Sequence, residues 1–106
     1  NLNLSNCGDK GLSVGEKSFV KLDEINVDNA VIGLASKDSS IVKLESASFK
    51  NLDTCISAYN KKQEFNGGIV EMNNLSCTNF KEKIKTDIHS KVLEKNKLVK
   101  KINIER

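Results

Sequence analysis

A unit of 22 residues recurs along this chain, and it constrains the fold more than any other feature of the sequence. The segment that begins at Gly11 returns 22 positions later at Gly33 and again at Cys55. The segment 20–29 also returns after 22 residues and then after 28 more, because six residues are inserted within 60–68. The 106 residues therefore hold about three and a half units. Such a short period predicts a solenoid, in which each unit buries its apolar face against the next.

Each unit contains three short stretches in which every second residue is apolar. This period is typical of β-strands that show one face to a core, and no unit carries a helical pattern. Three strands in one 22-residue turn predict a parallel β-helix, whose coils stack about 4.8 Å apart. The predicted interior columns are Leu12, Leu34, Ile56 and Ile84; Val20, Val42, Val70 and Val92; Leu22, Leu44 and Met72; Leu2, Ile25, Ala47 and Leu75; and Leu4, Val27, Phe49 and Cys77.

An asparagine lies two residues after the last apolar position of the third strand in every unit, and it predicts the corner between strands. Asn adopts the left-handed backbone conformation more easily than most residues with a side chain, and stacked amides can hydrogen-bond from coil to coil. A leucine-rich repeat is the rival solenoid, but its asparagine lies three positions after the last apolar residue rather than two. The predicted asparagine ladder consists of Asn6, Asn29, Asn51 and Asn79.

These repeats resemble the right-handed parallel β-helix, or pectate-lyase-like, superfamily of bacterial and phage proteins that act on polysaccharides. The resemblance covers residues 2 to about 94 and rests on strands that start with Gly11 or Gly33, strands that end in I-x-V-x-N, and the asparagine column. Cys55 departs from the first pattern because it replaces the glycine. The phrase GLASKDSSIVKLESASFKN is also similar to β-helical segments found beside spore-coat-protein-H-like kinase domains. The resemblance implies the fold and its right-handed sense, and it leaves the activity open.

The two ends of the chain leave the repeat in different ways. Residues 1–94 are predicted to form the coils, and 95–106 a basic C-terminal cap. The chain opens in strand register, so we expect either further coils before it or an edge through which the protein self-associates. Residues 91–104 are predicted to form a capping hairpin or strand. The alternative is a helix that aligns Ile84, Ile88 and Val92 in one stripe, although several residues there are poor helix formers.

Charge is distributed unevenly along the chain. Residues 1–80 hold eight lysines and ten acidic residues, whereas 81–106 hold nine basic and four acidic residues. Nucleic-acid binding is not expected from this tail, because it contains one arginine, Arg106, and little aromatic surface for stacking. Apolar runs stay well short of the roughly 18 residues that a membrane-spanning helix needs. The composition therefore points away from nucleic acids and membranes as partners.

The second strand of each coil is predicted to present two rows of polar side chains to the outside. One row contains Lys21, Lys43 and Glu71, and the other contains Asp23 and Glu45. In the superfamily that the chain resembles, this sheet often forms the floor of a sugar-binding groove. Asp23 and Glu45 would lie about 5 Å apart on neighbouring coils, which suits a Ca²⁺ site or an acid–base pair. The alternative is a solvated charged ladder that the two lysines neutralise.

The six-residue insertion is a second candidate site. Loops that project from solenoid turns often bind ligands. Phe65 lies in the insertion and Tyr59 stands beside it, so the two rings are a candidate platform for sugar stacking. The alternative is that Phe65 folds back over its own coil, which would gain about 1.5–3 kcal/mol from burial.

The sequence contains no complete catalytic constellation or metal-binding motif, and no cofactor is predicted. The resemblance implies that an active lyase would need a basic residue with clustered calcium-binding acids, and an active hydrolase several converging aspartates, yet no strand carries three acids. His89 is predicted to be a surface residue. We expect Cys7, Cys55 and Cys77 to be free buried thiols, because Cys7 and Cys55 would lie two coils, about 10 Å, apart.

The predicted function is that of a noncatalytic β-helical module of a bacterial surface or secreted protein, acting as a rigid stalk or a carbohydrate-binding face. One alternative is a fragment of a polysaccharide lyase, hydrolase or epimerase whose catalytic coils lie outside this chain. Another is an assembly element that docks through its open N-terminal strand edge. Expected partners are a polysaccharide and neighbouring coils or domains of a longer protein. The candidate ligand-binding residues are Tyr59, Phe65, Lys21, Lys43, Glu71, Asp23 and Glu45.

Overall fold

The protein is all-β in the computed structural model, which describes residues 2–61, 66–95 and 97–98. Within these ranges there is no helix, and hence none that is long and apolar enough to cross a membrane. One six-stranded sheet has the order β1-β2-β3-β4-β5-β6. Its strands are β1 (Leu2–Val14), β2 (Phe19–Lys37), β3 (Ile41–Tyr59), β4 (Ile69–Thr86), β5 (Lys91–Glu94) and β6 (Lys97–Leu98).

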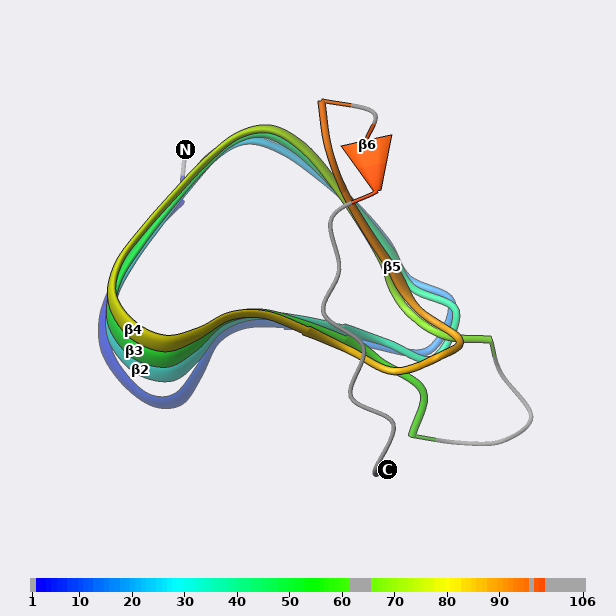
Figure 1. Ribbon diagram of the computed structural model, residues 1–106, viewed down its shortest axis with the longest axis horizontal. Coiled ribbons are helices and arrows are strands. Elements are labelled where there is room, and N and C mark those ends of the chain that lie inside the picture. The colour runs from blue at the N-terminus through cyan, green and yellow to red at the C-terminus, as the bar shows by residue number, and fades with distance from the viewer. Residues whose placement is uncertain (1, 62–65, 96, 99–106) are drawn as a thin grey trace.

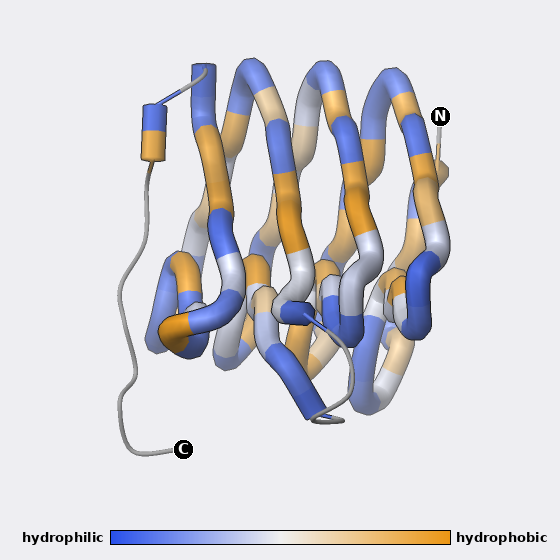
Figure 2. The backbone as a smooth tube through the Cα atoms, turned by 90° about the vertical axis from the view of Figure 1, so that its right-hand side faces the viewer, coloured by the Kyte–Doolittle hydropathy of each residue, from blue (hydrophilic) through white to orange (hydrophobic). Residues whose placement is uncertain are grey.

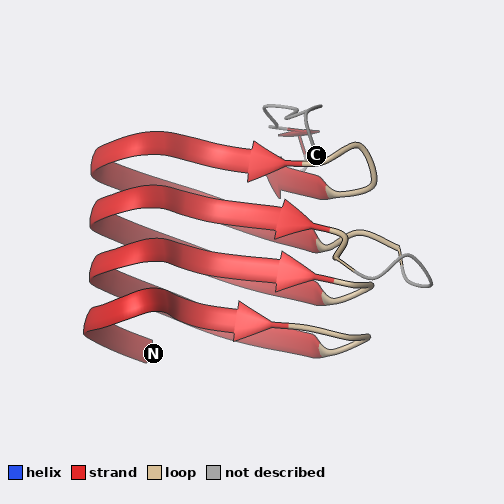
Figure 3. Ribbon diagram, turned by 90° about the horizontal axis from the view of Figure 1, so that it is seen from below, coloured by secondary structure: helices blue, strands red, loops and turns tan. Residues whose placement is uncertain are grey.

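The long strands β1 to β4 are bent, so that each runs round one turn of the chain and lies directly on the turn before it (Figures 1 and 3). Neighbouring strands from β1 to β5 pair in parallel. Apolar and polar residues alternate along much of each turn (Figure 2). The period of two, repeated at the same phase in every turn, therefore produces a stack of strands with a shared apolar interior.

All five predicted interior columns are confirmed by the strand register. Leu12 pairs with Leu34, which pairs with Ile56 and then Ile84. The other four columns align in the same way, including Leu4, Val27, Phe49 and Cys77. The core is most completely buried in the two middle turns, where Ile25, Leu34, Phe49 and Ile56 have no exposed surface.

The four predicted corner asparagines all adopt left-handed backbone angles, with φ between 53° and 66°. Asn29 donates a hydrogen bond from Nδ2 to Oδ1 of Asn6 (2.7 Å), and Asn79 donates to Asn51 (2.6 Å). Asn51, however, donates to Asp28 (2.8 Å) instead of Asn29. The asparagine ladder is therefore two separate pairs, and because their side chains are exposed, they stabilise the corners mainly through the backbone conformation.

Glycines in the column that begins at Gly11 face large side chains across the turn. A Cβ atom added at Gly11 would lie 2.9 Å from a methyl of Val27, and one at Gly33 would lie 2.5 Å from the Phe49 ring. In each of these turns a glycine, which has no side chain, therefore lies opposite a large residue 16 positions later. This pairing fills the interior at one level without overlap.

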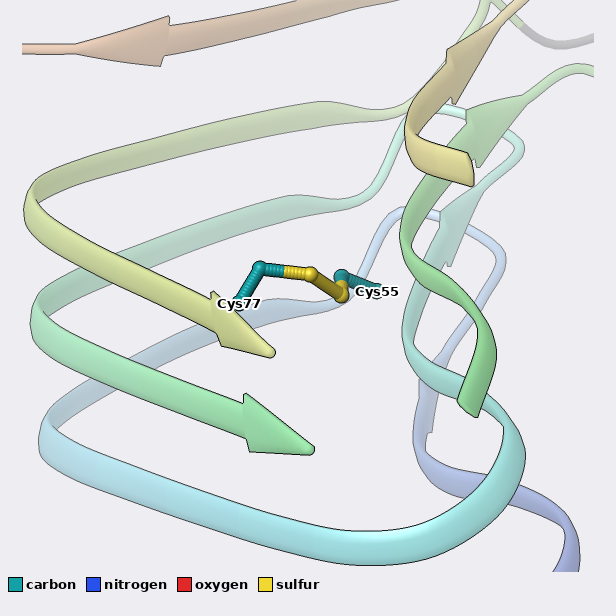
Figure 4. The surroundings of a disulfide bond; sticks show 2 residues. All are labelled: Cys55 and Cys77. Carbon is teal, nitrogen blue, oxygen red and sulfur yellow. A yellow bond between two sulfur atoms is a disulfide. The ribbon is translucent and has the colours of Figure 1, made fainter. Parts of the chain in front are cut away.

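Cys55 and Cys77 form a disulfide, so the expectation that both are free thiols is wrong (Figure 4). Their Cα atoms lie 6.5 Å apart, within the range of disulfide geometry. The expectation compared only cysteines stacked along the solenoid, whereas this bond crosses the interior of a turn. Cys55 stands in the glycine column and Cys77 in the column of Val27 and Phe49. Cys7 is free, as predicted, but it is only partly buried rather than buried.

The two ends of the sheet differ. β1 carries a bulge between Ser5 and Gly8, which accounts for its 23-residue offset at Leu2 and Leu4. At the other end, β5 covers only the first four residues of β4, and β6 pairs with β5 in antiparallel orientation. The alternative helix through Ile84, Ile88 and Val92 is absent, because β4 continues to Thr86 and a turn precedes β5. The rest of the predicted cap, from residue 99, lies outside the described residues.

Candidate functional site

A shallow groove lies on the outer face of the strand segments that open β2, β3 and β4. The register places Lys21 beside Lys43, and Lys43 beside Glu71, in one outward row. Asp23, Glu45 and Asn73 lie two residues further along the same segments and form the second row. The groove has a volume of about 210 Å³. Five of the seven predicted ligand-binding residues therefore line one depression: Lys21, Lys43, Glu71, Asp23 and Glu45.

Beside the groove lies an exposed aromatic ring that was not singled out from the sequence, and it contacts one of the lining residues, Lys43. Phe19 opens β2 and is 61% exposed. The Nζ atom of Lys43, on the next turn, lies 5.8 Å from the centre of this ring, within the range of a cation–π contact. The signal in the sequence was its position, since Phe19 alternates in phase with Lys21 and Asp23 and must therefore face outwards.

The charged groups of the groove are only partly satisfied by one another. Asn73 donates a hydrogen bond from Nδ2 to Oε1 of Glu45 (3.0 Å). Lys21 and Lys43 form no ion pair with any residue in the described part of the chain. The groove therefore offers ammonium donors, carboxylate acceptors and an amide at strand spacing, a set that hydrogen-bonds hydroxyl groups well.

The predicted pair of Asp23 and Glu45 is brought together, on adjacent turns of one face. The amide of Asn73 occupies one oxygen of Glu45. In residues 2–61, 66–95 and 97–98, no group of three or more His, Cys, Asp or Glu side chains could hold a metal ion. The pair is thus suited to accept hydrogen bonds from a ligand.

The two aromatic residues predicted near the insertion are not part of this groove. Tyr59 is half-buried at the end of β3, where its carbonyl oxygen accepts a hydrogen bond from the backbone N–H of Asp38 (3.3 Å). Phe65 lies outside the described residues. Tyr59 does not line the groove, so Phe19 is the aromatic residue that accompanies the outward rows.

A buried polar corner, formed by Asp38, Asp87 and Ser90, binds both ends of the insertion. It was not predicted from the sequence. Asp87 is 2% exposed, and its Oδ2 atom accepts a hydrogen bond from the backbone N–H of Asn60 (2.6 Å). Asp38 is fully buried and accepts one from the N–H of Lys61 (2.7 Å). On the returning side, the Ser90 hydroxyl accepts a hydrogen bond from the N–H of Gly68 (3.0 Å).

The same corner explains the pair of glycines that ends the insertion. A Cβ atom at Gly67 would collide with the backbone of His89, and one at Gly68 with the backbone of Ser36. His89 itself is exposed, as predicted, and its N–H donates to Asp87 (3.1 Å). The signal in the sequence was that Asp38 and Asp87 both lie where the apolar alternation breaks, just before the next turn begins.

Comparison of the chain with protein-family models, curated proteins and solved structures finds no match.

Proposed function

We propose that this chain is a right-handed parallel β-helix that acts as a noncatalytic polysaccharide-binding module. Support for the fold comes from the parallel pairing of successive turns and from asparagines in left-handed conformation at one corner of each turn. A right-handed sense is that of nearly all connections between parallel strands of one sheet. The parent protein would belong to a bacterial surface or the secreted fraction.

One observation carries the proposed binding function: the exposed Phe19 ring contacts Lys43, which lines a groove formed by two rows of unlike polar groups. A sugar presents apolar C–H faces as well as hydroxyl groups, so an aromatic ring beside several donors and acceptors matches both. Among the described residues Lys21 and Lys43 form no ion pair, so their ammonium groups can donate hydrogen bonds to a ligand.

The rigid setting of the groove favours binding of an extended ligand. Its residues lie on neighbouring strands that are hydrogen-bonded along their length, so little conformational freedom is lost when a ligand binds. The rows repeat at about 4.8 Å, and a polymer that lies along the stack can contact several turns at once. A linear polysaccharide fits this arrangement better than a compact small molecule.

The Cys55–Cys77 disulfide supports an extracellular setting for the parent protein. Disulfides form and persist in oxidising compartments and are rare in the cytosol. This inference does not depend on the ligand.

A second candidate function, assembly, is favoured by the outer edge of β1. In the described part of the chain, β1 pairs with β2 alone. Its interior residues Leu2, Leu4 and Leu12 are only partly buried. Antiparallel or parallel pairing with a second copy would satisfy this edge. Light scattering at increasing protein concentration tests it: a constant monomer mass contradicts assembly, whereas a dimer that Leu4→Lys abolishes supports it.

The test of the binding function is a glycan array probed with the protein and two variants. Phe19→Ala removes the exposed ring that contacts Lys43 beside the groove, and Phe80→Ala removes a second ring, 40% exposed, that follows the Asn79 corner on another segment. We expect binding to at least one polysaccharide class, weakened about tenfold by Phe19→Ala because one stacked ring contributes roughly 1.4 kcal/mol. The Phe80→Ala variant should bind like the parent. Equal binding by all three proteins, or none by any, contradicts the proposal.

A further inference from the structure

The disulfide joins two positions whose equivalents in the two preceding turns are in contact through packing alone. Gly11 faces Val27, Gly33 faces Phe49, and Cys55 faces Cys77. The register places the first members of these pairs in one column and the second members in another. The turn that bears the insertion is therefore the one in which a small–large pair is replaced by two small side chains and a bond.

The closed loop of this disulfide contains the insertion and one side of the groove. The separation between its cysteines is 22 residues, and the segment between them includes the insertion and the beginning of β4. Glu71 and Asn73 of the groove lie inside this segment, whereas Lys21 and Lys43 lie outside it. The bond thus fixes one side of the groove relative to the other.

The two cysteines of the disulfide differ in burial. Cys55 is fully buried, but Cys77 is only partly buried. Among the described residues, β5 pairs with Ile69–Met72 of β4 and leaves the part of β4 that carries Cys77 unpaired on that side. A thiol is therefore expected to attack Cys77 rather than the fully buried Cys55.

We infer that the Cys55–Cys77 disulfide is a redox-sensitive clamp on the insertion-bearing turn. A dithiol reductant attacks the Cys77 sulfur as a thiolate, forms a mixed disulfide there and releases Cys55 as a thiolate that takes up a proton. The second thiol of the reductant then displaces Cys77 and closes a cyclic disulfide. Two electrons pass to the protein, which gains two thiols, and the reductant is oxidised.

Reduction loosens one part of the protein and leaves the rest folded. Two cysteine side chains are together smaller than the Phe49 ring that fills this level of the preceding turn, so the insertion-bearing turn depends on its covalent link, which reduction removes. The first two turns contain no disulfide and keep their own pairs. The effect on the groove, through Glu71 and Asn73, rests on the proposed binding function, whereas the loosening itself does not.

Hydrogen exchange followed by mass spectrometry tests the clamp in the Cys7→Ser background, which prevents exchange with the free thiol. After dithiothreitol treatment, peptides within 52–77 are expected to exchange on the order of a hundredfold faster, the loop-closure value for a 22-residue separation. Peptides within 4–32 should keep their rates. Unchanged rates after both thiols are freed, equal acceleration of all peptides, or failure of dithiothreitol to reduce the folded protein overturns the inference.

Two variants distinguish the effect of losing the disulfide from any other effect of dithiothreitol. Cys55→Gly with Cys77→Phe copies the Gly33–Phe49 pair and should show no response to dithiothreitol. Cys55→Ala with Cys77→Ala should reproduce the reduced pattern without any reductant, and a fully protected 52–77 segment in this variant contradicts the clamp. The exchange readout does not involve a glycan, so absence of glycan binding would refute the proposed function and leave the clamp standing.

Discussion

Replacing Gly33 with alanine tests the packing on which the stacked turns depend. The added Cβ atom would lie 2.5 Å from Cδ1 of Phe49 and 2.7 Å from the carbonyl oxygen of Cys55. The ring is fully buried and the oxygen belongs to a paired strand, so neither can move away cheaply. Overpacking of this kind destabilises a core by about 1–3 kcal/mol. A loss of about 2 kcal/mol would lower Tm by roughly 10 °C in a domain of this size.

Chemical denaturation of four proteins measures this effect as a double-mutant cycle. Phe49→Leu alone should destabilise the protein by about 1–2 kcal/mol because it leaves a gap. In the Gly33→Ala, Phe49→Leu double variant the new methyl group occupies the gap. The double variant should therefore be destabilised by about 1 kcal/mol less than the sum of the two single variants. Gly15→Ala is the control, because its Cβ atom would meet only the flexible Lys37 side chain, and it should change stability by about 0.5 kcal/mol or less. Additive losses, or an unaffected Gly33→Ala variant, would refute the small–large pairing.

Three further results are expected. Gly33→Cys with Phe49→Cys should form a second disulfide, detected as a mass loss of two hydrogens, because these positions match those of Cys55 and Cys77 one turn earlier; two persistent free thiols would contradict the equivalence of the turns. Asn51→Ala should lower the free energy of unfolding by about 1–2 kcal/mol and Asn51→Gly by less, because φ is 63° there; equal losses in denaturation curves would show that the side-chain bond and not the backbone matters. Asp87→Ala should destabilise the protein by about 1–3 kcal/mol, because it removes a buried carboxylate that accepts a hydrogen bond from the partly buried N–H of Asn60. Asp53→Ala, at an exposed ion pair with Lys81, should have little effect. Similar losses in the two variants would contradict the role of the corner.

The interior of the fold could be predicted from the sequence because two repeat lengths, 2 and 22 residues, together determine the position of each interior residue. The period of two fixes which face of a strand is buried, and the 22-residue period fixes which residues are neighbours on adjacent turns. Val20 and Val42, for example, follow from these periods without knowledge of the turn's shape. The left-handed corners were predictable for a related reason, since Asn29 and its equivalents recur where only a few residue types fit.

Contacts across a turn were not predictable in the same way, because they depend on how the corners bend the chain. Cys55 and Cys77 meet through the interior and not along the stack. A hint was present, since Cys55 stands in a glycine column and Cys77 in the column of the largest side chain, Phe49. The polar corner around Asp38 and Asp87 escaped notice because it lies between strands, where the apolar alternation stops.

The outward rows of the groove were predictable from alternation, but the aromatic residue beside them, Phe19, was not recognised. Lys21, Lys43 and Glu71 were placed correctly because they alternate with interior residues. Phe19 has the same phase, yet an aromatic residue next to a turn is more often buried. Its exposure and the Lys43 contact needed the structure.

The most direct test of the account is to map the ligand onto the protein by NMR. Amide resonances of the isotopically labelled chain would be followed while the strongest glycan from the array is added. We expect the perturbed amides to cluster in three equivalent segments, 21–23, 43–45 and 71–73, which line the groove on successive turns. Perturbations concentrated on another face, or saturable binding that leaves these segments unchanged, would contradict the assignment of this groove as the polysaccharide site.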